Sequence, residues 1–348
     1  MARNLVGLDI GTSKVRAAEV ARGRGRPTVV RYAEAPLPVG AVRDGEVVNH
    51  DIVVEALRQV RTAGKFTNRD VVLGVGNQRT MVRSLDLPWM PMNQLRSTLA
   101  FQVGDMLPVP VEDAVLDYFP TTGYQQENGQ RTVHGLLVAA TRDTLGPNIA
   151  AAETAGWRPQ QIDLNAFALT RALGLLGIEQ RCVALVDIGA KTTNVVILDH
   201  GVPQLVRILA SGGQDATDAI ASELKVPLGD AEVLKRQVGL GFQVPEEYRA
   251  ASDIVNHVSG GLVESIRSTI TYYVQNNPGG APDLVLLTGG GSYLNGLGQY
   301  LSSVSRLTVS LVDFGSAVTI SKTANVASLQ GNETTIAVPL GLALAVQS

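Results

Sequence analysis

The sequence has little of what marks several large classes of protein. It contains one cysteine, Cys182, and four scattered histidines. A single cysteine excludes an intramolecular disulfide and indicates a reducing compartment, and no spacing suggests a metal site. The net charge of −3 lacks the basic footprint of nucleic-acid-binding proteins. No signal segment opens the chain, and no apolar run reaches the roughly 20 residues that span a bilayer. We expect a cytoplasmic protein with no nucleic-acid partner and no direct membrane insertion.

Two widespread nucleotide-binding patterns are also missing. No Gly-x-x-x-x-Gly-Lys-Ser/Thr segment occurs, which excludes a Walker A loop. Strand-like rather than helical segments follow the first glycine turns, which excludes a Rossmann fingerprint. Hydrophobic residues make up 45% of the chain and charged residues 18%, as in ordinary folded proteins. A chain of 348 residues is long enough that we expect two lobes.

The most informative feature that is present is a motif written twice. The stretch from Leu5 to Lys14 returns in altered form from Val183 to Thr192, so that Asp-Ile-Gly recurs after 178 residues. In both copies an apolar run leads to Asp-Ile-Gly, and a second strand-like run follows at 15–20 and at 194–198. Each copy therefore predicts a buried strand, a tight glycine turn and a returning strand.

The turn of each hairpin is suited to bind phosphate. Backbone N–H groups approach a phosphate oxygen most closely where glycine removes the side chain. The first turn, Gly11-Thr12-Ser13-Lys14, adds two hydroxyls and an ammonium, whereas Gly189-Ala190-Lys191-Thr192 has one hydroxyl fewer. We expect both turns to bind phosphate, the first more strongly. The plain alternative is that Asp and Gly only form a tight turn, but two copies at the starts of two lobes favour a phosphate site.

Further features of the sequence extend this prediction. Asp9 and Asp187 are too acidic to neighbour phosphates without a cation, so they predict Mg²⁺ held mostly through water. The turn Ser211-Gly212-Gly213 precedes a helical pattern, whose N-terminus would attract phosphate or ribose. The turn Thr288-Gly289-Gly290-Gly291-Ser292 follows an apolar strand and would let backbone pack against adenine or ribose. Each of these two turns is a weak signal alone, because many such turns bind no ligand.

The segment between the two hairpins changes character from about Leu87. Prolines at 88, 91, 108, 110 and 120 interrupt it, and strand-like runs alternate with helical patterns, which predicts an inserted β/α subdomain. Ahead of it, capping side chains at Asn49 to Asp51 predict a helix that ends at Ala63. Apolar patterns predict further helices at 163–176 and 336–346.

Together these motifs resemble the actin-like ATPase superfamily. Residues 7–15 and 185–198 look like its two phosphate motifs, and 288–297 looks like its adenosine motif. Residues 163–173 and 336–346 look like its two connecting helices. The resemblance implies a two-lobed α/β fold of the actin-like ATPase (ribonuclease H-like) type, with ATP and Mg²⁺ held between the lobes.

The inserted block resembles that of the PilM family of type IV pilus assembly proteins, in particular at 84–88 and 106–118. PilM and FtsA share this FtsA-type insertion, named subdomain 1C. FtsA normally ends in a membrane-binding helix, whereas this chain stops soon after the second connecting helix, which favours PilM. The resemblance implies a groove between subdomains 1A and 1C that takes the cytoplasmic N-terminal peptide of the inner-membrane protein PilN. It also implies a scaffold peripheral to the inner membrane through that partner, with motor ATPases among further pilus components.

The resemblance also implies subdomain boundaries. These are 1–86 for 1A, completed by about 160–183 and 322–348; 87–159 for 1C; 184–212 and 284–321 for 2A; and 213–283 for 2B.

The resemblance places the residue that orients the attacking water at the start of the first connecting helix. Relatives that hydrolyse ATP quickly place an acidic or amide side chain there to orient water, and by position this chain offers Asn165 or Asp163. A positioned general base contributes about 10²–10⁴ in rate, so an amide predicts at most a slow Mg-dependent ATPase. Asp163 could instead cap the helix. The alternatives to a scaffold are an FtsA- or MreB-like filament-forming protein and a small-molecule kinase that uses Asp163 as base.

Overall fold

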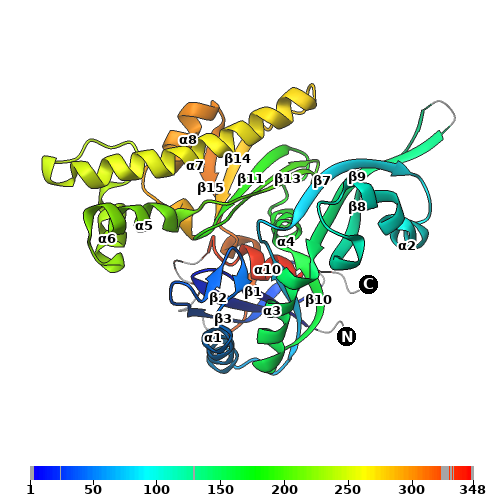
Figure 1. Cartoon of the computed structure of the whole chain (residues 1–348), viewed down its shortest axis with the longest axis horizontal. Helices are drawn as coiled ribbons and strands as arrows, with labels where there is room; N and C mark the ends of the chain where they lie inside the picture. Colours follow the sequence, from blue (N-terminus) through cyan, green and yellow to red (C-terminus); the bar gives the residue numbers. More distant parts are fainter. Residues whose placement is uncertain are drawn as a thin grey trace.

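The computed structural model describes residues 4–23, 25–127, 130–322, 329, 331 and 333–345. The chain forms two lobes and a smaller third unit, each built on its own β-sheet (Figure 1). The sheet of the first lobe, whose strands β1, β2 and β3 are blue in Figure 1, has the strand order β10-β6-β1-β2-β3-β16. Its strands are β1 (Leu5–Ile10), β2 (Lys14–Ala21), β3 (Thr28–Pro36), β6 (Asp70–Val75), β10 (Arg158–Leu164) and β16 (Thr319–Ile320).

The sheet of the second lobe repeats this arrangement, with the strand order β13-β12-β11-β14-β15. In each sheet the central hairpin is antiparallel, and its first strand has a parallel strand on the other side. The duplicated motif thus forms equivalent hairpins at the centres of two sheets, and the predicted two-lobed α/β fold is confirmed. The strands are β11 (Cys182–Ile188), β12 (Thr193–Asp199), β13 (Val202–Leu209), β14 (Leu284–Thr288) and β15 (Thr308–Leu311).

The third unit is a three-stranded antiparallel sheet in the order β7-β9-β8, which lies to the right in Figure 1. Helix α2 (Met92–Val103) covers one face of this sheet through Leu95, Leu99 and Val103, which pack with Tyr118. Hydrogen bonding to β9 begins at Met81, so this sheet starts ahead of the expected boundary at residue 87. Its strands are β7 (Met81–Pro88), β8 (Ala114–Glu127) and β9 (Gln130–Thr141), with short 3-10 helices η1 (Gly104–Met106) and η2 (Val111–Asp113).

Helices cover the outer faces of the two main sheets. Helix α1 (His50–Ala63) is capped as predicted by Asn49, whose side chain accepts a hydrogen bond from the Ile52 backbone N–H. Helix α3 (Arg142–Thr154) packs on α1 in the first lobe, although it follows the three-stranded sheet in the sequence. No helix of the described ranges is long and apolar enough to cross a membrane. The remaining elements are the ribbon β4 (Val42–Arg43) and β5 (Glu46–Val47), and in the second lobe α5 (Gly213–Leu224), α6 (Leu228–Val238), η4 (Glu246–Tyr248), α7 (Arg249–Asn276), η5 (Gly290–Tyr293) and α8 (Leu297–Ser305).

Two helices pack against each other between the lobes, α4 (Asn165–Leu173) and α10 (Ala337–Ala343) (Figure 1). Their backbones meet at Gly341, where a Cβ atom would lie 1.8 Å from the carbonyl oxygen of Ala168. A Cβ atom on Gly7 of β1 would likewise lie 2.0 Å from the Pro339 carbonyl oxygen. Glycine therefore lets both α4 and β1 pack directly on the backbone of α10.

Some expected limits differ from the observed ones. The first connecting helix begins at Asn165 rather than at Asp163, because the two preceding residues continue β10 alongside β6. Strand β16 pairs with β3 of the first lobe, although the expected boundaries put residues up to 321 in the second. The second connecting helix ends at Ala343, and Val346 lies outside the described residues, as do 323–328 of the expected 322–348 segment. Two short 3-10 helices, η3 (Gly174–Leu176) and η6 (Gly315–Ala317), complete the fold.

Candidate functional site

The two hairpin turns have the same backbone geometry. The Gly11 N–H donates to the Lys14 carbonyl at 3.0 Å, and the Gly189 N–H donates to the Thr192 carbonyl at 2.9 Å. Strands β1 and β11 are almost wholly buried. Each apolar run therefore ends with its Asp-Ile-Gly at the C-terminal end of a central strand.

The second hairpin turn is in direct contact with both other glycine turns. The backbone N–H groups of Gly213 and Gln214 donate to the carbonyls of Gly189 and Ala190 at 2.9 and 2.8 Å. A Cβ atom on Gly212 would lie 2.5 Å from the Ala190 carbonyl oxygen, so only glycine allows this approach. The start of α5 is therefore fixed against the hairpin by backbone contacts.

The turn at 288–292, which resembles the adenosine motif, packs against the same hairpin. Gly289 has a φ of +83°, a conformation that favours glycine, and a Cβ atom there would lie 2.4 Å from the Ile188 carbonyl oxygen. A Cβ atom on Gly291 would lie 2.4 Å from the Ile188 side chain, and Gly290 is exposed. Three segments that are distant in the sequence thus meet at backbone level in the second lobe.

Two carboxylates lie at the roots of the hairpins, Asp9 buried and Asp187 half-buried. Asp9 is 5% exposed and accepts a bond from Arg16 at 3.2 Å, whereas Asp187 accepts one from the Asn194 amide at 3.2 Å. Burial raises the pKa of Asp9 above its usual range, although the neighbouring Arg16 charge opposes this. Burial also raises the pKa of Asp187 to about 6, with the charge of Asp9 adding to the rise. The charge of Asp9 therefore acts on Asp187 across the lobes.

Unpaired polar atoms gather beside these carboxylates. Six buried side-chain polar atoms of the described residues have no hydrogen-bond partner, and three of them are Arg16 Nε, Asn165 Oδ1 and Asn194 Oδ1. A buried polar atom without a partner costs about 1–3 kcal/mol. Because one donor and two acceptors without partners lie around Asp9 and Asp187, this region has the composition of a polar ligand site.

The structure separates the two candidates for orienting water. Asn165 lies over Gly74, where a Cβ atom would be 2.4 Å from Asn165 Oδ1, and its side chain is close enough to Asp9 to oppose the rise of the pKa of that carboxyl. Asp163 is instead paired with Arg171, whose Nε donates to the Gly341 carbonyl at 2.9 Å. Asp163 therefore links β10 to the two connecting helices, and α4 begins without a side-chain cap.

Both lysines of the turns have carboxylate partners. Lys14 Nζ lies 2.5 Å from Glu34, while Lys191 Nζ lies 2.8 Å from Asp215 and also contacts Asp218. Asp215 additionally accepts the Gly212 N–H, so Lys191 helps to connect the second hairpin to α5. To bind a phosphate, either ammonium would have to keep its carboxylate partner and contact the phosphate as well, or leave the carboxylate.

Two residues at the site carry no signal in the motifs themselves. Lys235 of α6 is 8% exposed and donates to the Gly213 carbonyl at 2.9 Å and to Thr217 at 2.8 Å. Glu232, three residues earlier, lies 2.6 Å from the same ammonium. The Glu-x-x-Lys spacing is readable on a helix, but only the fold shows that this pair lies against a glycine turn.

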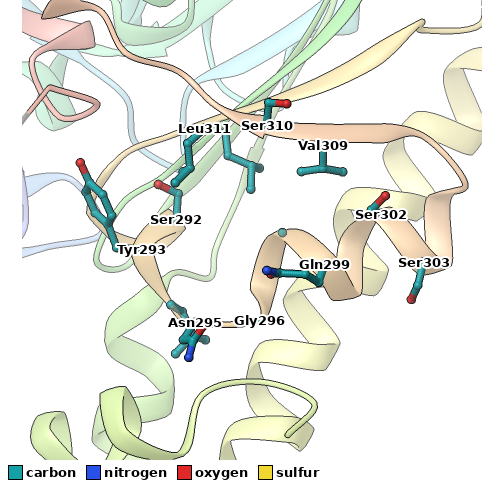
Figure 2. Close-up of a pocket in the computed structure, with 13 residues that line it drawn as sticks. Ser292, Tyr293, Asn295, Gly296, Gln299, Ser302, Ser303, Val309, Ser310 and Leu311 are labelled. Atoms are coloured by element: carbon teal, nitrogen blue, oxygen red, sulfur yellow. The ribbon is translucent and has the colours of Figure 1, made fainter.

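A cavity of about 690 Å³ lies outside this convergence, between α8, β15 and the residues after Gly291 (Figure 2). The described residues that line it include Asn295, Gln299, Ser302 and Leu311, and none of them is charged. Since phosphate recognition uses cationic groups and converging amides, this cavity is not the phosphate site.

Mg²⁺ fits the residues at the two hairpins. The ion prefers oxygen ligands, keeps several waters, and binds through one or two carboxylates together with substrate phosphates. Asp9 and Asp187 supply two carboxylates, and the charge of Asp9 acts on Asp187. The unpaired Oδ1 atoms of Asn165 and Asn194 could accept bonds from the waters of the ion.

Comparisons with known proteins agree with this architecture. The family model described as "Type IV pilus assembly protein PilM" matches residues 7–347. The solved structure of a "PilM-PilN type IV pilus biogenesis complex" contains a similar chain, with 27% identity and a TM-score of 0.85 over 98% of this chain and 97% of that one.

More distant relatives share the fold. Cell division protein FtsA of Neisseria meningitidis is 24% identical over 343 residues, which cover 87% of this chain and 82% of that protein. The structure of MreB5 of Spiroplasma citri bound to ADP has 14% identity and a TM-score of 0.54, and covers 97% of this chain and 98% of the other. These similarities confirm the predicted actin-like ATPase fold.

Proposed function

Because the chain belongs to the PilM family of type IV pilus assembly proteins, we propose that it is a nucleotide-binding scaffold of the pilus assembly machinery. ATP and Mg²⁺ bind between the lobes, and a PilN-like membrane protein supplies a cytoplasmic N-terminal peptide. The scaffold lies at the inner membrane through this partner and connects it to other pilus components, motor ATPases included.

One observation carries the nucleotide part of this proposal. The turns at Gly189, Gly213 and Gly291 are in backbone contact beside the carboxylates of Asp9 and Asp187 and a set of unpaired polar atoms. Phosphates would receive backbone N–H groups from the turns at Gly11 and Gly189, and ribose would lie near the buried ammonium of Lys235. Bound Mg²⁺ would neutralise phosphate charge, held by Asp9 and Asp187 through water.

The same geometry favours slow hydrolysis. Asn165 is the side chain at the start of α4 that reaches Asp9, and an amide can orient a water molecule but cannot accept its proton. Asp163 is paired with Arg171 and is not free to act as a base. The nucleotide then serves mainly to hold the two lobes in one arrangement.

The surface between β8 and β10 is the proposed peptide site. Both are edge strands of their sheets, and an extended peptide can add to such an edge. Phe119 of β8 contacts Phe167 of α4 with ring centroids 5.0 Å apart, so the two units meet here. Val115 and Ile162, at 41% and 36% exposed, offer apolar contacts on either side. The similar chain of known structure forms a complex with PilN, which supports a PilN-like partner.

A peptide titration tests this proposal. A peptide matching the cytoplasmic N-terminus of the neighbouring PilN-like membrane protein should bind, and ATP–Mg²⁺ should change its affinity. Val115→Lys should abolish binding, because it places a charge on the proposed apolar surface. Phe101→Lys is the matched control, since Phe101 is 93% exposed on α2, which covers the opposite face of the sheet. Failure to bind with and without nucleotide contradicts the scaffold function.

Sedimentation distinguishes the scaffold from the filament alternative. The scaffold proposal expects the protein to stay in the supernatant at micromolar concentration with ATP–Mg²⁺. Pellets that form only with nucleotide would support a filament-forming protein instead.

A further inference from the structure

Arg16 occupies an unusual place in the first lobe. It lies on β2 directly opposite Asp9 of β1 and Glu34 of β3, so that the three side chains form one row across the sheet. The guanidinium is 3.2 Å from Asp9 and 3.9 Å from Glu34, and the side chain is 17% exposed. A cation is thus built into the sheet beside the root of the first hairpin.

The second lobe carries a neutral residue at the equivalent place. Asn194 lies opposite Asp187 just as Arg16 lies opposite Asp9, in hairpins with the same backbone geometry. The backbone of the motif is duplicated, but its charge is not. The arginine is therefore not a requirement of the hairpin fold, since the second hairpin forms without one.

The donors of Arg16 are only partly used. Nη1 binds Asp9, whereas Nε is buried and has no hydrogen-bond partner. Arginine is suited to bind carboxylate and phosphate at once, because its planar fork presents several donors in fixed directions. The charge of Arg16 also acts on Asp187 across the lobes. A polyphosphate that enters beside the two hairpins would meet this cation.

We propose that Arg16 is a phosphate-binding residue of the cleft and lets the chain bind nucleotide with little dependence on Mg²⁺. This inference rests on the proposed nucleotide site and adds to it a built-in cation. With Mg²⁺ absent, Arg16 supplies positive charge between the polyphosphate and the carboxylate of Asp9. With Mg²⁺ present, the metal and Arg16 share that task.

The test measures the affinity of ADP and of ATP by calorimetry, once with Mg²⁺ and once with EDTA. The wild-type chain should lose less than about tenfold in affinity when Mg²⁺ is removed. Arg16→Asn installs the residue of the second hairpin and should bind about ten- to a hundredfold more weakly in EDTA. In Mg²⁺ the affinity of this variant should fall less below that of wild type. Its affinity should therefore differ more between Mg²⁺ and EDTA than the wild-type affinity does. Equal losses in both conditions, or no loss in EDTA, overturn the inference.

Two further variants keep the test interpretable. Arg31→Asn is the matched control, because Arg31 of β3 pairs with Glu19 of β2 at 2.6 Å in the same sheet. It should leave both affinities unchanged. Arg16→Lys keeps the charge without the fork and should fall between wild type and Arg16→Asn in EDTA, which also serves if Arg16→Asn does not fold. A wild-type chain that binds no nucleotide would instead refute the proposed function itself.

Discussion

Asp9 and Asp187 occupy the same place in two copies of one motif and have different neighbours. Asp9 has an arginine beside it, whereas Asp187 has an amide. A carboxylate removed from water needs compensation, and a cation provides more of it than an amide does. Burial raises the pKa of both carboxyl groups, that of Asp187 to about 6, and at Asp9 the charge of Arg16 opposes the rise.

At this scale we expect Asp9→Ala and Asp187→Ala to weaken ATP binding in the presence of Mg²⁺. Each removes an oxygen ligand for the ion or its waters, and a charge-assisted bond is worth about 1.5–3 kcal/mol, or roughly tenfold or more in affinity. Calorimetry measures the loss. Asp199→Ala is a control at the far end of β12, where the carboxylate pairs with His200. Unchanged affinity in either variant would remove that aspartate from the site.

The same substitutions should differ in their effect on folding. Asp9→Ala leaves the largely buried Arg16 with only Glu34 at 3.9 Å, whereas Asp187→Ala leaves only an amide without its acceptor. An uncompensated buried charge is the more costly. The free energy of unfolding without nucleotide, measured by urea titration, should therefore fall more for Asp9→Ala.

The sequence predicts which residues stand in the turns but not their partners. The glycines and aspartates are readable because their chemistry is local to each motif. Lys14 and Arg16 could have been placed on one face of a strand from their period-2 spacing. Their common neighbour Glu34 could not, because it lies on the next strand and its register is set by the fold.

Among the secondary-structure elements, the crossing of α4 and α10 has the closest fit. Gly341 and Ala168 meet at backbone level, and Arg171 reaches from α4 to the Gly341 carbonyl. Small side chains, including Ala166, Ala168 and Ala172 on α4, keep the two helices close.

We expect Gly341→Ala to destabilise the protein by about 3 kcal/mol or more. Its methyl group would lie 1.8 Å from the Ala168 carbonyl oxygen, and inserting one carbon into a packed core typically costs about 1–3 kcal/mol, occasionally more. Urea unfolding measures this change. Gly174→Ala is the matched control at the end of α4, where a Cβ atom meets nothing within 4 Å, and should lie within about 1 kcal/mol of wild type. Similar midpoints for the two variants would contradict this account of the crossing.

The limits of these helices were only partly predictable. The Asn49 cap of α1 is a local signal and is found as predicted. Asp163 looks like a similar cap but lies within β10, because parallel pairing with β6 extends to Leu164, and its side chain pairs with Arg171. Local sequence patterns do not contain that pairing.

In the whole molecule, residues from both lobes contribute to the proposed site. The first lobe supplies Asp9 and Arg16, and the second supplies Asp187 and all three glycine turns that meet. The pairing of β16 with β3 and the packing of α3 on α1 join segments distant in the chain. The two-lobed fold was predictable because the repeated motif is visible in the sequence. The limits of the lobes were not, because they depend on these long-range contacts.

A ligand that bridges the lobes should stabilise the folded chain as a unit. At a hundred times its dissociation constant, a ligand that binds only the native state adds about 2.7 kcal/mol. We therefore expect ATP to raise the thermal unfolding midpoint by several degrees in wild type. The rise should be smaller in Gly212→Ala, whose methyl group would lie 2.5 Å from the Ala190 carbonyl oxygen. Gly229→Ala, in open space on α6, is the control and should respond as wild type. An equal rise in all three would exclude the Gly212 turn from the site.

The contact between Gly341 and Ala168 also has a mechanical consequence. The two backbones touch there, side chains such as Leu169 and Leu340 pack around the contact, and Arg171 spans it, so that α4 and α10 are held in one arrangement. Helix α7 has 28 residues and is therefore about 42 Å long. Each degree of rotation moves one end of such a lever by about 0.7 Å relative to the other. A rotation of the second lobe by a few degrees would therefore move one end of α7 by a few ångströms relative to the other.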